Sequence, residues 1–481
     1  MKRLLSCCAA AGLMISAVWT GAAAGLQAAA EALCPELAAS AYAAAPNAPA
    51  PTSDGALRLD SGAGTLTYAV EVPQAGVYQT VLEWQVVPQQ KSDVDIVVTV
   101  QLNGGAVRAA RLPRLWVDDG EPYVDRLGNE FAPNQKELAA WQSTRLYENA
   151  GAYTTPMTAE LQAGHNELSL TVSSGELLLR AIRLTEYRQP PSHREYAAQH
   201  KGAVYDGPDI VLEGEAAVYK SDRFILPLSD VNTVSAKPAS AQVGLLNYIG
   251  GSNWKRLGDT ITWEAVVPKT AWYRVGFHYR QSFSAGSVSY RQLTVNGEVL
   301  FSVCGSVAFP YNTGWEYLTL GTEDGETCLV YLEAGRNTLS LTVSLGDMEA
   351  LCARLSEAVY ELAAVYRDLR SVTGEAPDAN RDYGLFQQIP DLERRLTDLM
   401  DELESLAQTS ERLAQATGGS GAEWCFARRA RSRCPPVRNS AAAAAQDSAA
   451  PVHAAARGAA GRRFLPGVRA EAAVSRRGQN R

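Results

Sequence analysis

The chain has 481 residues, of which 46% are hydrophobic and 20% charged, and its 44 lysines and arginines against 52 aspartates and glutamates give a formal net charge of −8. These values are ordinary for folded protein and argue against disorder of the whole chain. The mildly acidic balance argues against nucleic acid as a partner, and without a run of about 18 apolar residues after position 30 we expect no internal membrane span.

The N-terminus has the layout of a secretory signal peptide. Lys2 and Arg3 precede an apolar run over residues 4–19, and small residues follow it. A charged start, a hydrophobic core and a small-residue cleavage site predict a signal peptide over residues 1–30. We therefore expect a secreted or cell-surface protein, with an Ala- and Pro-rich spacer over residues 31–54.

An internal duplication is the most informative feature of the chain. Residues 64–85 align with residues 259–280, and residues 161–175 align with residues 332–346, where eleven of fifteen positions are identical. Self-similarity of this kind indicates two copies of one structural unit.

The matched blocks are predicted to be strands. Leu168, Leu170 and Val172 alternate with Ser169 and Thr171, and the second copy repeats this alternation. A period of two with one polar face is typical of half-buried antiparallel strands.

Each copy also contains an Asn-Gly pair, at 103–104 and at 296–297, which predicts a tight hairpin. Many short strands with turn residues between them predict a mainly β protein with two tandem jelly-roll β-sandwich modules, over residues 55–188 and 208–346. Residues 189–207 form the expected linker between the modules.

The pattern changes at Asp347. Apolar residues recur at spacings of three and four from there to about Thr373, and again from Asp391. This spacing predicts an α-helical hairpin over residues 347–418. The hairpin either packs against the second sandwich or serves as a spacer or docking stalk for a following domain.

The last part of the chain, residues 419–481, is predicted to be a disordered tail. Residues 425–481 contain 12 Arg, no Lys and 17 Ala, and only seven large apolar residues. So little apolar surface cannot offset the entropy of folding. Because the composition is unlike that of the preceding chain, we hypothesise that the tail is a frameshift product of GC-rich DNA.

The repeat resembles a known family. Val70 to Tyr78 reads V-x-V-P-x-x-G-x-Y, residues 295–297 read V-N-G, and residues 332–343 read L-x-A-G-x-N-x-L-x-L-x-V. These motifs resemble the family 6 and family 35 carbohydrate-binding modules and their galactose-binding-like relatives. The resemblance implies non-catalytic binding of a polysaccharide or oligosaccharide.

Two such modules before a helical segment also resemble the N-terminal part of solute-binding proteins of Gram-positive extracellular sugar transporters. The matching parts are residues 244–255 and segments between 373 and 391, and the resemblance covers residues 55–415. It implies a truncated solute-binding component of a sugar ABC transporter, with a membrane permease as a further partner.

Loop aromatics are the candidate sugar-binding residues, because flat rings can stack on a pyranose and loops commonly carry sites. The first copy carries about 22 extra residues between its Asn-Gly pair and its last block, and this loop is rich in aromatics. The alternative is that each ring packs a sandwich core. The predicted ligand-binding residues are Trp116, Tyr123 and Trp141 in the first copy and Tyr248, Asn253, Trp254, Tyr311 and Trp315 in the second.

The second copy opens with an acidic segment, residues 210–216, which looks like the first strand of the family. In the family, carboxylates at the positions of Glu213 and Glu215 help to hold a structural calcium ion, which takes oxygen ligands. The alternative is an edge strand with a solvated acidic face.

Catalytic signatures are missing from the sequence. It contains no G-x-S-x-G, no G-x-G-x-x-G and no H-E-x-x-H, and its five histidines stand apart. A cell-surface adhesion or structural protein, whose sandwiches bind protein or act as spacers, is therefore the second hypothesis. A glycoside-acting enzyme is the third.

Overall fold

The computed structural model describes residues 36–45, 47, 50–87, 94–151, 153–283, 288–322, 325–378 and 380–416. The expected signal peptide and the whole of the predicted tail lie outside these residues. The chain divides into two compact units, of which the first comprises Met1–Tyr273, Leu293–Cys304 and Tyr331–Val343, and the second comprises Arg274–Gln292, Gly305–Val330 and Ser344–Arg481. The division passes through the second copy of the repeat.

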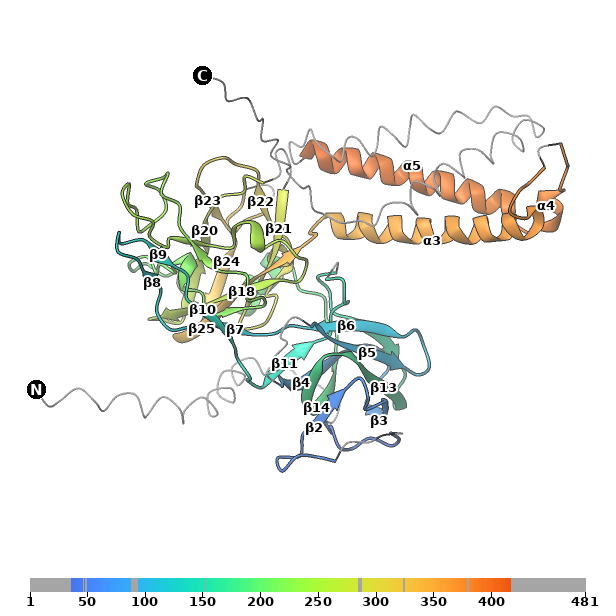
Figure 1. The fold of residues 1–481 in the computed structure, drawn as a ribbon, viewed down its shortest axis with the longest axis horizontal. Coiled ribbons are helices and arrows are strands. Elements are labelled where there is room, and N and C mark those ends of the chain that lie inside the picture. The colour runs from blue at the N-terminus through green and yellow to red at the C-terminus, as the bar shows by residue number, and fades with distance from the viewer. Residues whose placement is uncertain are drawn as a thin grey trace, which may run out of the picture. The chain divides into compact units, whose positions relative to one another are not determined.

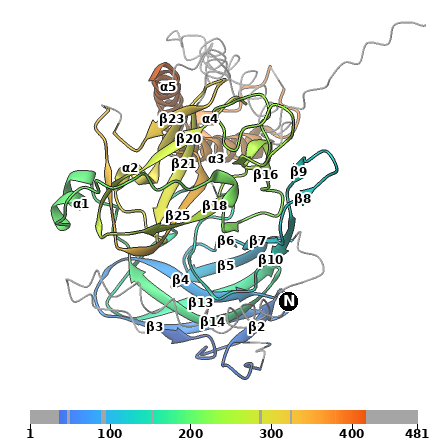
Figure 2. The ribbon, with the colours of Figure 1, turned by 90° about the vertical axis from the view of Figure 1, so that its left-hand side faces the viewer.

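The first copy is a β-sandwich of two antiparallel sheets, as predicted, whose strands β2 to β6, β13 and β14 are visible in Figure 2. One sheet has the order β1-β14-β4-β11, with β12 on β4 and β2 on β14. These strands are β1 (Leu37–Ala38), β2 (Leu57–Asp60), β4 (Gly76–Val86), β11 (Gln142–Arg145), β12 (Thr158–Leu161) and β14 (Glu176–Glu186). The other sheet has the order β3-β13-β5-β6, with β3 (Thr65–Val72), β5 (Ile96–Leu102), β6 (Arg108–Leu112) and β13 (Gly164–Ser174).

Alternation along these strands builds the core of the first sandwich. Leu66, Tyr68, Val70 and Val72 of β3 are buried, whereas the residues between them are exposed or half-buried. Their neighbours in the core come from both sheets and include the fully buried Trp84. Because side chains of a strand point to opposite faces, a period of two places one apolar face inward. Within the expected spacer, β1 pairs with β14, and the Tyr68 hydroxyl donates to the Ala39 carbonyl at 2.8 Å.

The second copy forms a larger sheet around the strands that match the first copy. In the first unit the order is β10-β7-β15-β18-β25-β21, and β21 continues into the second unit, where it pairs with β22. The bounds are β7 (Trp116–Asp119), β10 (Asn134–Glu137), β15 (Tyr219–Lys220), β18 (Thr260–Val267), β21 (Val288–Val295), β22 (Val307–Pro310) and β25 (Gly335–Ser344).

Shorter elements complete the second copy and its approach. The strand pairs are β8 (Tyr123–Val124) with β9 (Glu130–Phe131), β16 (Pro227–Leu228) with β17 (Tyr248–Ile249), β19 (Ala271–Arg274) with β24 (Leu329–Leu332), and β20 (Gly276–Tyr279) with β23 (Glu316–Thr319). The helical turns are α1 (His193–Gln199), η1 (Gly214–Ala216), η2 (Gly251–Asn253) and α2 (Ser302–Gly305). Ser192 and Glu195 form a capping box that begins α1 inside the expected linker.

The duplicated motif is explained by a network that both copies share. Asn103 and Asn296 have φ of 48° and 51°, each followed by a positive-φ glycine, as the predicted hairpin turns require. The Asn103 amide donates to Asn166 Oδ1 at 2.8 Å, and the Asn296 amide donates to Asn337 Oδ1 at 3.0 Å. The asparagine of A-G-x-N and the asparagine of the Asn-Gly turn are therefore partners in both copies.

The extra residues of the first copy form strands of the second copy's sheet. Strand β7 pairs with β10 on one side and meets β15 on the other, where Trp116 is opposite Lys220. The Lys220 side chain is fully buried, and its Nζ donates to Asp118 Oδ1 at 2.6 Å, which compensates the buried charge. The hairpin β8–β9 extends from the ends of β7 and β10 (Figure 2). The insertion is thus a strand-forming element rather than a free loop.

The helical hairpin is formed as predicted. Helix α3 (Met348–Thr373) and helix α5 (Leu392–Ala416) run antiparallel and are joined through α4 (Leu385–Gln388), as Figure 1 shows. Gly374 ends α3 with φ of 74°, a conformation that favours glycine. The helices pack through Ala358, Val365, Leu392, Leu399 and Leu406. Among the described helices, none combines the length and the apolar character that crossing a membrane requires.

Candidate aromatic binding site

Aromatic side chains gather on the strand pair β20–β23 of the second unit. His278 of β20 is opposite Tyr317 of β23 in the register, and their rings are stacked with centroids 4.3 Å apart and planes 16° apart. The Trp315 ring lies 5.2 Å from the His278 ring. Three rings from two strands and one loop therefore form a single group.

Strand alternation separates this group from the packed side of β20. Phe277 and Tyr279, on either side of His278, contact Phe309 of β22 with ring centroids 5.4 and 5.1 Å apart. Because neighbouring residues of a strand point to opposite faces, the packing of Phe277 and Tyr279 leaves His278 on the other face. The Tyr317 side chain there is 81% exposed.

The electrostatics of the group suit a neutral or anionic ligand. Burial lowers the pKa of His278, so its imidazole is neutral at pH 7. The Arg280 guanidinium lies over the Trp315 ring, 5.1 Å from its centroid. The buried Asn312 fixes the adjoining loop, because its Oδ1 accepts the Gln281 N–H at 2.8 Å. Exposed ring faces beside directional polar groups can stack on a sugar and orient it.

Two of the predicted ligand residues, Tyr311 and Trp315, belong to this part of the second unit. Tyr311 is half-buried and directly precedes Asn312, and Trp315 is one of the three rings. Sequence reasoning missed His278 and Tyr317. The signal for Tyr317 was its spacing of two from Trp315, which places both rings on one side of an extended segment.

The three predicted residues of the first copy have different surroundings. Trp116 is 6% exposed in β7, so it offers little ring face to a ligand. Trp141 is half-buried under the Arg180 guanidinium, which lies 3.6 Å from its ring centroid. Tyr123 is exposed in β8, with its ring 6.0 Å from that of Phe131. These three residues stay predictions as ligand contacts.

The remaining predicted residues anchor loops of the first unit. Trp254 donates from Nε1 to the Asp259 carbonyl at 3.1 Å and packs against a small cluster of Ala217, Ile225 and Ile261. Asn253 donates from Nδ2 to the Phe224 carbonyl at 3.1 Å. Tyr248 lies half-buried in β17, paired with Leu228 of β16. Their part in ligand binding also stays a prediction.

The acidic segment of the second copy differs from the expected strand. Residues 210–213 belong to no strand, and residues 214–216 form the turn η1, so the prediction of a first strand here is wrong. The Trp263 indole donates to the Gly214 carbonyl at 2.9 Å and stabilises this turn.

The turn brings carboxylates together. Glu215 Oε2 is buried and makes no hydrogen bond within the described residues. Burial, and next the negative charges of Glu213 and Glu130, raise the pKa of Glu215. An orphaned carboxylate oxygen is one ligand of the kind that a hard cation such as calcium takes. No group of three or more His, Cys, Asp or Glu side chains has metal-binding geometry in the part of the chain that the structure describes.

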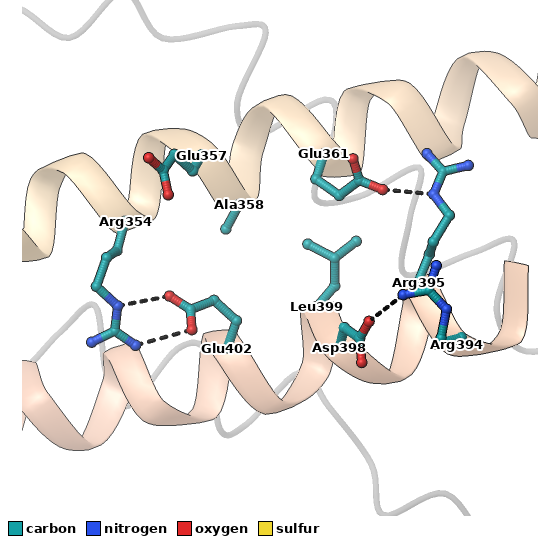
Figure 3. Close-up of a pocket in the computed structure, with 9 residues that line it drawn as sticks. All are labelled: Arg354, Glu357, Ala358, Glu361, Arg394, Arg395, Asp398, Leu399 and Glu402. Carbon is teal, nitrogen blue, oxygen red and sulfur yellow. Dashed lines mark hydrogen bonds and ion pairs between the residues drawn. The ribbon is translucent and has the colours of Figure 1, made fainter. Parts of the chain in front are cut away.

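A hollow lies between the helices of the hairpin and is lined mostly by charged residues (Figure 3). Arg354 donates to Glu402 at 2.8 Å, and Arg395 donates to Glu361 at 2.6 Å. Because these charges neutralise one another, the hollow is better explained as a row of ion pairs between the helices than as a ligand site.

Comparison with known proteins gives two kinds of relative. The family described as "Bacterial solute-binding protein, 4-helix bundle domain" matches residues 351–423. Solved structures of carbohydrate-binding modules are also similar to the chain, each over part of its length. No curated protein matches it.

Three of these structures illustrate the likeness. The C-terminal family 6 module of the laminarinase LamC from Zobellia galactanivorans is 16% identical, with 32% of this chain and 99% of that chain covered and a TM-score of 0.21. The family 35 module from Clostridium thermocellum is 16% identical, with 31% and 98% covered and a TM-score of 0.18. A mannanase with a family 35 module from Podospora anserina is 17% identical, with 34% and 29% covered and a TM-score of 0.22.

The chain thus spans less than a third of that mannanase. At these TM-scores the likenesses carry no further argument. Both comparisons nevertheless return the classes of protein that the sequence resembles, so the predicted resemblance is confirmed.

Proposed function

We propose that the protein is an extracellular, non-catalytic carbohydrate-binding protein and a relative of the solute-binding component of a sugar transporter. The observation that carries the proposal is the group of His278, Trp315 and Tyr317, with Tyr317 almost fully exposed. Exposed rings would stack on the apolar face of a pyranose, and Arg280 and nearby loop amides would orient its hydroxyls. The ligand class is a polysaccharide or oligosaccharide.

The transporter link is supported by the match of residues 351–423 to a solute-binding helical-bundle family. In this proposal the hairpin connects the binding modules to the transport machinery, with a membrane permease as the final partner. The proposal includes a structural calcium ion at Glu213 and Glu215, where the orphaned carboxylate oxygen would be neutralised by the cation.

Binding to a glycan panel tests the proposal. Mannan, arabinogalactan and cellotriose are titrated calorimetrically into the full chain, and retardation in polysaccharide gels is measured alongside. Tyr317→Ala is expected to weaken binding by about fivefold, because loss of one stacked ring removes roughly 1 kcal/mol. The thermal midpoint should not change, because the side chain is exposed.

Tyr360→Ala is the matched control, since Tyr360 is an exposed tyrosine on helix α3. It should leave binding unchanged. Full binding by Tyr317→Ala and Trp315→Ala, or an equal loss with Tyr360→Ala, would contradict the placement of the site. Absence of binding to every glycan would contradict the function itself.

A second candidate function is adhesion to protein, which the hairpin β8–β9 favours. Tyr123, Val124, Leu127 and Phe131 are all exposed there, and contiguous exposed apolar residues often mark protein contacts. Under this alternative, Leu127→Asp abolishes binding to protein-coated surfaces, whereas Tyr317→Ala has no effect.

A further inference from the structure

The helical hairpin has two lateral sides of opposite character. One side carries the ion pairs Arg354–Glu402 and Arg395–Glu361, which link α3 to α5 (Figure 3). A third pair, Arg395–Asp368, also links the two helices. These pairs satisfy the charges of that side within the hairpin. The seam between the helices is apolar and contains Ala358 and Leu399.

The other side is apolar. A helical residue is rotated by about 100° from its neighbour, so Val359 and Met400 lie one step beyond the buried Ala358 and Leu399, away from the ion pairs. They are 44% and 50% exposed. Leu355, Leu362 and Tyr366 of α3 and Leu396 and Leu403 of α5 continue this face, which we call the apolar stripe.

Two helices alone cannot cover this stripe. Several leucines that pack against the hairpin core stay only partly buried, including Leu355, Leu362 and Leu396. A bundle of four helices buries such faces on all sides of a central core. The family that matches residues 351–423 is described as a four-helix bundle, yet the described part of this segment holds two long helices.

The sequence after the hairpin is a poor source for two more helices. Residues 425–481 contain only seven large apolar residues, whereas an amphipathic helix needs about three in every seven positions. A second copy of the hairpin, by contrast, supplies an identical apolar stripe of matching length. An identical face on both partners is what a two-fold interface requires.

The charges on the helix surfaces favour one packing arrangement of the two copies. Beyond Met400, the rim of α5 is acidic, with Glu393 and Glu404 both exposed. The corresponding rim of α3 is small and uncharged at Ser356 and Ala363. Packing α5 against α5 of the partner would place like charges together, whereas packing α5 against α3 avoids this repulsion.

We propose that the apolar stripe is a homodimer interface, in which α3 of one copy packs against α5 of the other to complete a four-helix bundle. This inference is independent of the sugar-binding proposal, because it uses none of the residues of β20 and β23.

Sedimentation equilibrium of the full chain tests the interface. The wild type is expected to be a dimer at micromolar concentration, and Val359→Lys with Met400→Lys is expected to be a monomer. Both side chains are half exposed in the single hairpin, so the helical signal in circular dichroism should persist. Met400→Gln, a milder change, should raise the dissociation constant by about tenfold.

Tyr360→Lys is the matched control, because Tyr360 is exposed on α3 but lies about 200° from Ala358, outside the stripe. It should remain dimeric. A wild type that is still monomeric at 100 µM, about a hundredfold above a dissociation constant of 1 µM, overturns the proposal. A dimer that survives the double substitution, or that Tyr360→Lys dissociates, places the interface elsewhere and also overturns it.

Discussion

Replacing Asp259 with Asn should stabilise the protein at neutral and alkaline pH. Asp259 is 4% exposed at the start of β18, and its Oδ1 lies 3.8 Å from Arg111 Nη2. Burial raises the pKa of Asp259 to about 7, against the pull of Arg256 in the opposite direction. The folded protein therefore holds this proton much more tightly than the unfolded chain does.

The sign of the pH dependence follows from that difference. A raised pKa in the folded state favours folding below the unfolded pKa of 3.8, and this contribution is lost as the pH rises towards 7. A pKa difference of one corresponds to about 1.4 kcal/mol, so the difference of about three between the folded and unfolded states limits the loss of unfolding free energy to roughly 4 kcal/mol. Asparagine cannot ionise, so Asp259→Asn removes this loss.

Thermal unfolding between pH 4.5 and 8.5, followed by tryptophan fluorescence, measures the effect. Near pH 4.5 the two proteins should have similar midpoints, and at pH 8 the variant should unfold on the order of 8 °C higher. Trp254 is a local reporter, because its indole donates to the Asp259 carbonyl.

Asp401→Asn on α5 is the control, since that carboxylate is exposed, and it should not alter the pH profile. A variant less stable than the wild type at pH 8 would refute the reasoning. It would mean that attraction to Arg111 and Arg256 outweighs the burial of the carboxylate.

Two further predictions concern the turn and the acidic segment. Asn296→Ala should lower the free energy of unfolding by about 2 kcal/mol, because the Asn296 side chain donates to Asn337 and accepts from Thr338 N–H, and because the turn needs a positive φ. Asn296→Asp keeps the acceptor for Thr338 N–H, so thermal unfolding should show a smaller loss. Without metal, stability should fall as the pH rises through the raised pKa of Glu215, and Glu215→Gln should abolish this fall. Calcium should raise the midpoint of the wild type but not of Glu215→Gln, and an equal rise in both would exclude Glu215 as a ligand.

The sandwich architecture was predictable because its signals are local. Alternation along β3 and β13 and the Asn-Gly turns at 103 and 296 depend only on neighbouring residues. The strands β7 and β10 were not predictable, because they join a sheet of the other copy through the pairing of β7 with β15. Trp116 pairs with Lys220, more than a hundred positions away, and no short-range pattern encodes that choice.

The candidate site was only half predictable for a related reason. Trp315 was found because candidates were sought in loops, and rings in strands were left to the alternative that they pack a sandwich core. This rule holds for Phe277 and Tyr279, which pack on Phe309. It fails for His278 and Tyr317, because the strand pair β20–β23 has only two strands and leaves one face open.

The strands that the first copy contributes to the second copy's sheet make the second copy dependent on the first. If the chain were cut within residues 189–207, β7 would still hold the fragments together through the bond of Lys220 to Asp118. The β8–β9 hairpin would do so through Asn129 and Glu130, which accept the N–H groups of Gly244 and Leu246. Expressed alone, the second copy would expose the edge of β15 and leave the charge of Lys220 without Asp118. Duplication here has therefore produced a tandem in which the second copy cannot be exchanged as a self-contained domain without the insertion of the first.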